Sequence, residues 1–235
     1  MAAGYGTSPF FVFSGYDADG EYFQFVELLF GGLPARYKAD GLDGHSWWPL
    51  FRTTPAEYAE SYYPVRISSY EPARDTGGAG FHRGGTGIEK TYVFTGPGSF
   101  TVNDDRATIP PWGINGGRHG GCSTKTLVRL TGEVIELASK IDQVPVNAGD
   151  ALVFRTAGAG GWGDPLDRDP QLVLRDVLRD LVSQEVALRD YGVVIDGTTV
   201  DRSATVSERT RQSDERGPVQ PFDFGHAPKP LGGSS

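Results

Sequence analysis

The stretch YPVRISSYEPARDTGGAGFHRGGTG, residues 63–87, decides the fold. Its first part, VRISSYE at 65–71, is a β-like run, and a glycine-rich loop carrying Arg74, Asp75, His82 and Arg83 follows it. Glycine permits positive φ and close backbone approach, so such a loop can turn its N–H groups toward an anion or a partner backbone, or simply form turns between strands. It is not a Walker loop, because no Lys-Ser or Lys-Thr pair follows the glycines.

On the amino-terminal side of this stretch, the sequence predicts a hairpin and then a long loop. Residues 10–30 hold two aromatic and β-branched runs around a turn that ends in Asp19-Gly20. Residues 31–63 lose this periodicity and predict an irregular loop with one short helix, capped by Thr54 and with Pro55 as its first residue. Long ordered loops in compact domains are usually functional.

On the carboxyl-terminal side, further β-like runs recur between glycine-rich turns. They lie at 88–94, 99–104, 125–130, 133–138 and 151–156. Regularly spaced runs of this kind predict an α+β fold that is predominantly β, either a sandwich or a barrel-like sheet, over residues 1–165.

A helix pair is predicted over residues 169–192. Asp169 and Pro170 have the pattern of an N-cap and a first helical residue, and Ser183 begins a second helix that ends at Gly192. One domain is therefore expected over residues 1–199. Beyond Thr199 the chain becomes polar and then rich in Pro and Gly, so we expect residues 200–235 to be a tail that is disordered or draped over a partner.

Composition bounds the class of protein. A chain of 235 residues with 38% hydrophobic content suits a soluble globular protein, and a net charge of -8 without clustered Lys and Arg argues against nucleic acid or an anionic membrane as partner. No apolar run approaches the length of a membrane span, and the start has no signal-peptide pattern. The single cysteine, Cys122, permits no intrachain disulfide, so a cytoplasmic location is expected.

Acidic residues give two candidate sites. Glu57 and Glu60 lie three apart, so a helical turn would place both carboxylates on one face for acid–base work, with two solvated glutamates as the alternative. Asp40, Asp43 and His45 share a loop and could bind a metal, although a solvated Asp-rich loop is the commoner explanation. No two of the four histidines have metal-ligand spacing, which makes a metal site within this chain alone improbable.

Two other patterns resemble functional motifs, and we interpret both as structural. Cys122 follows two glycines and has His119 as the nearest base in the sequence, but a small residue in a tight turn is the simpler explanation. The run GAGGWG at 158–163 resembles a dinucleotide-binding fingerprint. The Asp-Pro that follows it cannot begin the close-packed helix that this motif requires.

Several segments together resemble the hydantoinase B/oxoprolinase family, with N-methylhydantoinase B-like proteins and acetone and acetophenone carboxylase subunits among its members. In order, they are GGLPARYKADGLDG at 31–44, residues 54–87, NDDRATIPPWGINGG at 103–117, Ser139-Lys140, and residues 148–194. Each is weak alone, but the ordered set is highly specific. Because family members are longer, the resemblance identifies the chain with their carboxyl-terminal portion and implies one half of a split subunit or a fragment.

The resemblance implies an enzymatic role within a multi-subunit complex. The expected reaction is the ATP-dependent opening of cyclic amides, namely hydantoins, 5-oxoproline or lactams. The expected partners are a hydantoinase A-type subunit and a polypeptide that supplies the amino-terminal half of a B-type subunit. The resemblance leaves open two alternatives, a subunit of an ATP-dependent ketone carboxylase and a noncatalytic scaffold. The chain is expected to be inactive alone.

The resemblance also suggests which residues face a shared active cavity. Glu57, Glu60 and Asp75 are the candidate catalytic residues. Candidate substrate-binding or partner-binding residues are Asp40, Asp43, Arg74 and Arg83, since guanidinium forks suit carboxylate and phosphate. We expect no cofactor or metal in this chain, and in the complex ATP, Mg²⁺ and, as one option, a further divalent metal.

Overall fold

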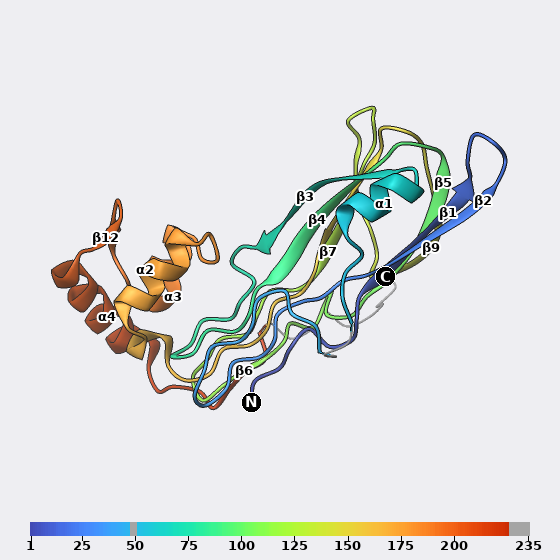
Figure 1. Cartoon of the computed structure of the whole chain (residues 1–235). Helices are drawn as coiled ribbons and strands as arrows, with labels where there is room; N and C mark the ends of the chain where they lie inside the picture. The colour runs from blue at the N-terminus through green and yellow to red at the C-terminus, as the bar shows by residue number, and fades with distance from the viewer. Residues whose placement is uncertain (48–50, 226–235) are drawn as a thin grey trace, which may run out of the picture.

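The computed structural model describes residues 1–47 and 51–225. Three regions follow one another along its length, a β-sandwich, a glycine-rich region of extended segments and a group of helices (Figure 1). Among the described residues, no helix has the length and apolar character needed to cross a lipid bilayer.

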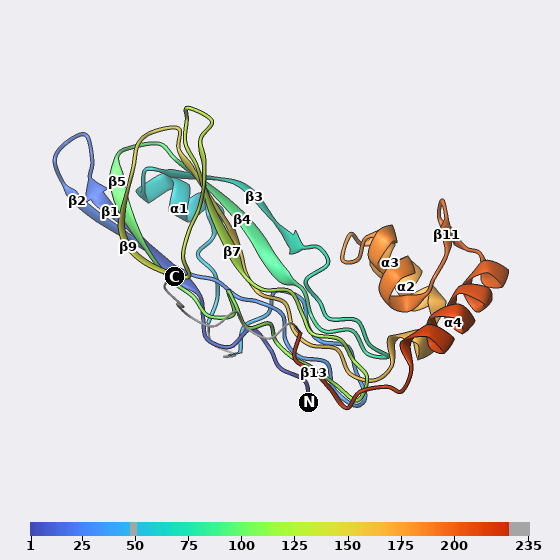
Figure 2. The same ribbon diagram turned by 180° about the vertical axis from the view of Figure 1, so that it is seen from behind.

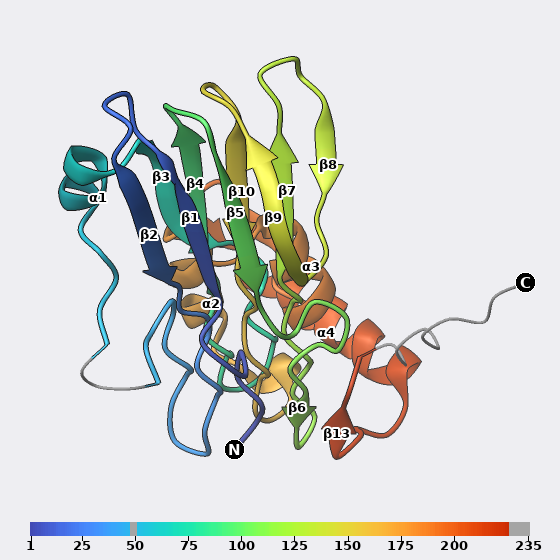
Figure 3. The same cartoon turned by 90° about the vertical axis from the view of Figure 1, so that its right-hand side faces the viewer.

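Two antiparallel sheets form the sandwich, which confirms the predominantly β fold and shows that it is not a closed barrel. The first sheet has the order β2 (Tyr22–Leu28), β1 (Phe10–Tyr16), β5 (Gly98–Asn103) and β9 (Lys140–Val146). The second has the order β3 (Val65–Ala73), β4 (Gly87–Phe94), β10 (Ala151–Arg155), β7 (Thr124–Val128) and β8 (Val134–Glu136). Figure 3 shows the first sheet in front of the second.

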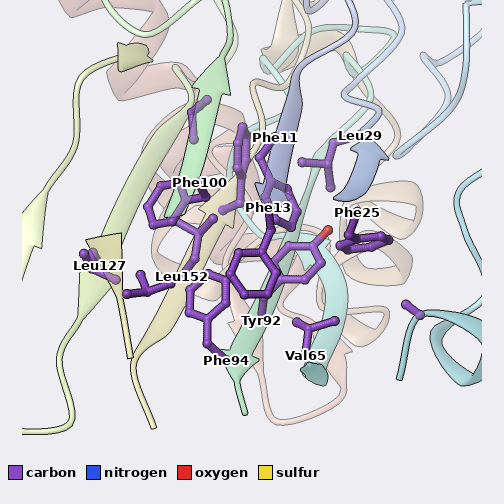
Figure 4. Packing of buried hydrophobic residues seen from close by; sticks show 14 of the residues in the cluster. Phe11, Phe13, Phe25, Leu29, Val65, Tyr92, Phe94, Phe100, Leu127 and Leu152 are labelled. Carbon is purple, nitrogen blue, oxygen red and sulfur yellow. The ribbon is translucent and has the colours of Figure 1, made fainter. Parts of the chain in front are cut away.

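Aromatic side chains fill the space between the sheets. Phe11 and Phe13 alternate with outward-facing residues on β1, and their rings lie 4.5 Å from Tyr92 and 4.7 Å from Phe94, measured between centroids. Figure 4 shows these four side chains converging from β1 and β4. Aromatic pairs at this spacing add stabilisation beyond the apolar area they bury.

Strand β9 is an element that the sequence analysis missed. Its sequence, KIDQVPV, mixes polar residues with Pro145, and proline cannot donate to a ladder. The strand is tolerated because it lies at the edge of its sheet, where its pairing with β5 shifts register between Phe100 and Val102.

Below the sandwich, extended segments form a hydrogen-bonded bundle around residues 157–162. The N–H groups of Gly158 and Gly161 donate to the carbonyls of Gly121 and Arg118, whereas Ala159 and Trp162 donate to those of Gly85 and His82. Hydrogen bonds to a third set of neighbours are formed by Gly160, which donates to the Ala3 carbonyl, and by Ala157, whose carbonyl accepts from the Gly32 N–H. Successive residues thus form hydrogen bonds with three different neighbouring segments in turn. The pattern repeats every three residues, as in a polyproline II helix.

Glycine is required in this bundle by sterics. A Cβ built on Gly158 would lie 1.8 Å from the carbonyl oxygen of Thr76, and one on Gly160 would lie 1.9 Å from that of Trp112. Gly84 and Gly85 in the 77–87 loop are equally confined, each with a backbone oxygen 2.0 Å from the Cβ position. The loop is therefore part of a packed core built from backbone atoms.

The predicted helix pair is confirmed in its bounds and caps. Helix α2 (Pro170–Leu178) is capped by Asp169, whose side chain accepts from the Gln171 N–H. Helix α3 (Gln184–Tyr191) is capped by Ser183 and ends at Gly192 in the left-handed region. A short 3-10 helix, η1 (Pro165–Asp167), connects the bundle to this pair.

The expected tail is corrected over most of its described length. Residues 202–216 form helix α4 (Arg202–Arg216), capped by Asp201 and laced by the ion pairs of Arg211 with Glu208 and Glu215. Its polar composition resembles that of a disordered segment, but i,i+3 and i,i+4 pairs and a cap support a helix. The Arg216–Asp164 ion pair ties α4 to the bundle. Residues 226–235 lie outside the described residues.

Smaller elements complete the structure. Strand β13 (Phe222–Asp223) returns to pair with β6 (Gly113–Ile114), and β11 (Ile195–Asp196) pairs with β12 (Thr199–Val200). Figure 2 labels β13 near the N-terminus and β11 beside the helices. Helix α1 (Ala56–Tyr62) lies beside β3. The prediction of a Thr54 cap for α1 is wrong, because Pro55 occupies the N-cap position and Thr54 donates its N–H to Glu27 instead.

We expect Gly158→Ala to destabilise the bundle strongly. The added methyl group would overlap a backbone carbonyl, and overpacking of this kind costs about 3 kcal/mol or more where the backbone cannot move. The free energy of unfolding in urea measures this. Gly96→Ala is the control, because its Cβ would meet only the Pro64 side chain, 3.1 Å away. Equal unfolding free energies for the two variants would contradict the steric argument.

Candidate functional site

Three of the predicted site residues, Asp40, Asp43 and Arg83, meet in one ionic network with Arg168 and Asp176. Arg83 binds Asp43 through both terminal nitrogens, at 2.9 and 3.1 Å. Arg168 binds both oxygens of Asp40 at 2.7 Å and reaches Asp176 at 2.8 Å. The Asp176 carboxylate also lies 3.4 Å from Arg83 Nε, which joins the two forks into one cluster.

Local backbone contacts place the two aspartates. Asp40 accepts from the Arg83 N–H at 2.9 Å, and Asp43 accepts from the Thr86 N–H at 2.8 Å. Both carboxylates thus bind N–H groups of the 77–87 loop, as an Asp side chain commonly does in turns. The network fixes the long 31–45 loop against the glycine-rich loop and against α2, from which Asp176 projects.

The charged groups of this network are largely buried, so each needs an oppositely charged partner to offset the loss of solvation. Arg168 is fully buried, and Arg83 and Asp176 are each 3% exposed. Burial by itself lowers the pKa of the Arg168 guanidinium, but the hydrogen bonds and charge of Asp40 outweigh burial and raise that pKa. Burial conversely raises the pKa of Asp40, and Arg168 overcomes this effect and lowers it. Each group is therefore held ionised by its partner, as a buried pair must be.

The rim of the network contains a carboxylate–imidazole pair. His82 Nδ1 lies 3.5 Å from Asp40 Oδ1, with side chains 19% and 26% exposed. The His82 ring contacts the rings of Phe81 and Trp162, at centroid distances of 4.9 and 5.9 Å. Asp40 therefore contacts the His82 imidazole as well as the Arg168 guanidinium, and both members of the His82–Asp40 pair are partly exposed.

The residues Arg74 and Asp75 join the loop to the helices. Arg74 is exposed and pairs with Asp180 at 2.8 Å. Asp75 adopts a left-handed φ of 66°, and its carboxylate accepts from the Ser183 N–H at 2.7 Å, at the start of α3. In this structure Asp75 therefore supports a helix start.

Glu57 and Glu60 lie on α1, which packs on the sandwich away from the helices α2 to α4 (Figures 1 and 3). Both are exposed, and Glu60 accepts from the Ile67 N–H at 2.8 Å. The structure thus brings Asp40, Asp43 and Arg83 together and places these glutamates on a different part of the chain.

Sequence reasoning missed Arg168. Arg168 stands between two Asp-Pro pairs in DPLDRDP, where a charged residue resembles a solvated linker residue. Its burial depends on Asp40, which is distant in sequence.

Two buried lysine–carboxylate pairs were also missed. Glu27 and Lys90 are 0% and 1% exposed and 2.9 Å apart, and burial raises the pKa of Glu27 despite the opposing charge of Lys90. Asp104 and Lys125 form a second such pair. A usable signal was the charged residue at an inward position of each strand, as in IEKTYVF and KTLVRL.

The oxygen atoms of the network are poorly suited to a divalent metal. Those of Asp40 and Asp43 already accept from guanidinium and backbone N–H donors. His45 Nδ1 is engaged by the Ser46 carbonyl at 2.8 Å. Across the residues that the structure describes, no group of three or more His, Cys, Asp or Glu side chains is arranged to hold a metal ion.

The glycine run at 158–163 does not offer a phosphate cradle. The N–H groups of Gly158, Gly160 and Gly161 are all donated to carbonyls within the bundle. A phosphate site needs such groups free and converging on the anion. The interpretation of this run as structural agrees with these contacts.

Cys122 is half-buried, and burial raises the pKa of its thiol. The nearest base in sequence, His119, turns its Nδ1 to the Gly120 carbonyl at 2.9 Å. A raised pKa disfavours the thiolate that a nucleophile needs.

Comparison with known proteins identifies the family. The profile of the Hydantoinase B/oxoprolinase family matches residues 1–165, and the chain belongs to this family. It is 32% identical over 208 residues to the B-type subunit of a putative D-/L-hydantoinase from Pseudomonas sp. (strain NS671), covering 87% of this chain and 35% of that protein. It is 35% identical over 167 residues to the caprolactamase beta subunit of Pseudomonas jessenii, covering 65% of this chain and 27% of that one.

Structural comparison finds the same fold in a nucleotide-free acetone carboxylase. The TM-score is 0.76 at 19% identity, over 92% of this chain and 34% of that one. The chain thus spans about a third of the length of these relatives.

We expect Arg168→Met to destabilise the chain by about 3–5 kcal/mol, because it removes the bidentate partner of Asp40 and the nearest cation of the buried Asp176. Urea unfolding measures the loss. Arg74→Met is the matched control, since it removes an exposed ion pair and should leave the unfolding midpoint unchanged. Similar midpoints for both variants would show that the network does not support the fold.

Proposed function

We propose that this chain works as a subunit, or part of one, in an ATP-dependent enzyme that hydrolyses cyclic amides such as hydantoins, 5-oxoproline or lactams. The observation that supports this most directly is its sequence kinship with subunits of a hydantoinase and a caprolactamase, two proteins named for cyclic amides. ATP would supply a phosphoryl group that activates a poorly electrophilic amide for later displacement.

The proposed partners are a hydantoinase A-type subunit and a polypeptide equivalent to the amino-terminal half of a B-type subunit. The supporting observation is that the chain spans 35% of the hydantoinase relative and 27% of the caprolactamase relative. On this proposal, ATP, Mg²⁺ and any further metal are bound in the complex, and the isolated chain is inactive.

Within this proposal, the rim formed by Asp40, Asp43 and His82 faces the shared active cavity. Arg83 and Arg168 act as positioning residues, because their guanidinium groups already form ion pairs with Asp43 and Asp40. His82 is the proposed proton carrier, oriented by Asp40 at 3.5 Å. Asp75 and Arg74 would then act through the position of α3, whereas Glu57 and Glu60 would need a partner surface to complete a site.

A noncatalytic scaffold is the second candidate, and the pairing of the ionic network within the chain favours it. Every charged group of the network has a partner within the chain, an arrangement suited to holding two loops and a helix in place. On this alternative the chain positions the catalytic groups of its partners and supplies none itself.

Reconstitution tests the leading proposal. The chain is co-expressed with its A-type and amino-terminal B-type partners, and ATP hydrolysis is measured with hydantoin, 5-oxoproline or caprolactam. We expect ATP turnover that depends on a cyclic amide and on the presence of this chain. Turnover that depends instead on acetone or acetophenone with bicarbonate, and on no cyclic amide, would establish ketone carboxylation and overturn the proposal.

The scaffold alternative is distinguished by substitutions at partly or fully exposed residues, which we expect to leave the fold intact. Arg83 cannot serve, because its buried side chain holds Asp43. In the assembled complex, we expect His82→Gln to lower kcat at least tenfold with assembly unchanged. The double variant Glu57→Gln, Glu60→Gln should lower kcat only if α1 contributes to the active cavity. Unchanged kcat in all these variants would favour a scaffold.

A further inference from the structure

The outward face of the β1–β2 hairpin is apolar, although it is a face of an antiparallel sheet that nothing described covers. The register pairs Phe10 with Leu28, Val12 with Val26 and Tyr16 with Tyr22. These side chains alternate with inward-facing residues such as Phe11 and Phe25, so they lie on the opposite side of the sheet. Tyr16, Tyr22 and Val26 are 66%, 59% and 50% exposed.

The other sheet of the same sandwich provides an internal comparison. The outward positions of β4 and β10 include Glu89 and Arg155, which form an ion pair, and Thr91 bonds Ser69 across to β3. That face has the polar character expected of a solvated sheet. The outward face of β1 and β2 has no charged residue, since Ser14 and Gln24 are its only polar pair.

The hairpin face is open in this structure. Figure 3 shows β2, β1, β5 and β9 turned toward the viewer, with α1 beside the sheet and the other helices behind it. Strands that read as apolar on both sides are usually buried on both sides. This hairpin therefore has the composition of a strand pair that is covered in the functional assembly.

The relatives indicate what covers it. In the hydantoinase and caprolactamase relatives, this chain corresponds to only 35% and 27% of the polypeptide. A body about two to three times the size of the matched part accompanies it in these relatives and must pack against some part of its surface. An uncharged, apolar face is suited to such a permanent contact, because obligate interfaces are more apolar than transient ones.

We propose that the outward face of β1 and β2 is the docking surface for the remaining, amino-terminal part of a family-length B-type subunit, whether that part is a separate chain or the same polypeptide. The inference rests on the proposed function for the identity of the partner. The contact is apolar, centred on the Val12–Val26 and Phe10–Leu28 pairs, with Tyr16 and Tyr22 at one end.

The test compares two exposed valines on opposite sheets. Val26→Lys places a charge in the proposed contact, and Val134→Lys places the same charge on β8 of the other sheet, where Val134 is 63% exposed. Each variant of the full chain is titrated by calorimetry with the polypeptide from the same source that matches the rest of the family. ATP, the A-type subunit and any cyclic amide are omitted, so the result does not depend on activity. Far-UV spectra and urea midpoints of the free variants check that both remain folded.

We expect Val26→Lys to raise Kd at least tenfold and Val134→Lys to leave it unchanged. Equal binding by wild type and Val26→Lys, or an equal loss in both variants, would overturn the proposal. It would also be overturned if the free chain were a dimer that Val26→Lys dissociates, because the occupant would then be a second copy. Binding that behaves as expected in a complex without amidase activity would leave the docking surface standing and remove the proposed function alone.

Discussion

In the glycine-rich bundle, backbone carbonyl oxygens occupy the space that side chains would otherwise fill, and the rest of the structure depends on this close backbone packing. The central segment, residues 157–162, distributes its hydrogen bonds over three sets of neighbours with a three-residue repeat. The neighbouring chains approach so closely that even a methyl group on Gly158 or Gly160 would overlap a backbone oxygen. The bundle lies between the sandwich and the helices, so it fixes the loops that carry Asp40, Asp43 and Arg83 (Figure 1).

The sequence predicted correctly those helices and strands whose caps and inward-facing residues lie within the element itself or next to it. Asp169 and Ser183 cap their helices through their own neighbours, and the β-like runs of the sandwich carry their inward aromatic residues in sequence order. Strand β9 was missed because its pairing with β5, rather than its own composition, defines it. Helix α4 was missed because its ion pairs offset a composition typical of disorder.

The candidate site was predictable in part for the same reason. Asp40, Asp43 and Arg83 were selected by family resemblance, but that they form one cluster depends on the path of the bundle. Arg168 makes the cluster complete and carries no local signal, since its partner Asp40 is far away in the sequence. The glycines indicated close backbone approach without indicating which segment approaches, because hydrogen bonding between extended segments leaves no periodic pattern of apolar side chains.

The bundle also affects the rate at which backbone amide protons of this chain exchange with solvent. Polyproline II is a major conformer of unfolded chains, so this backbone conformation does not by itself distinguish a packed segment from an unfolded one. Here segments with that repeat are buried and mutually hydrogen-bonded, with Ala157 and Ala159 each at most 1% exposed. Their amide protons should therefore exchange slowly with solvent, although they are neither helix nor strand. Hydrogen exchange would therefore detect order in this region that a measure of helix and strand content would miss.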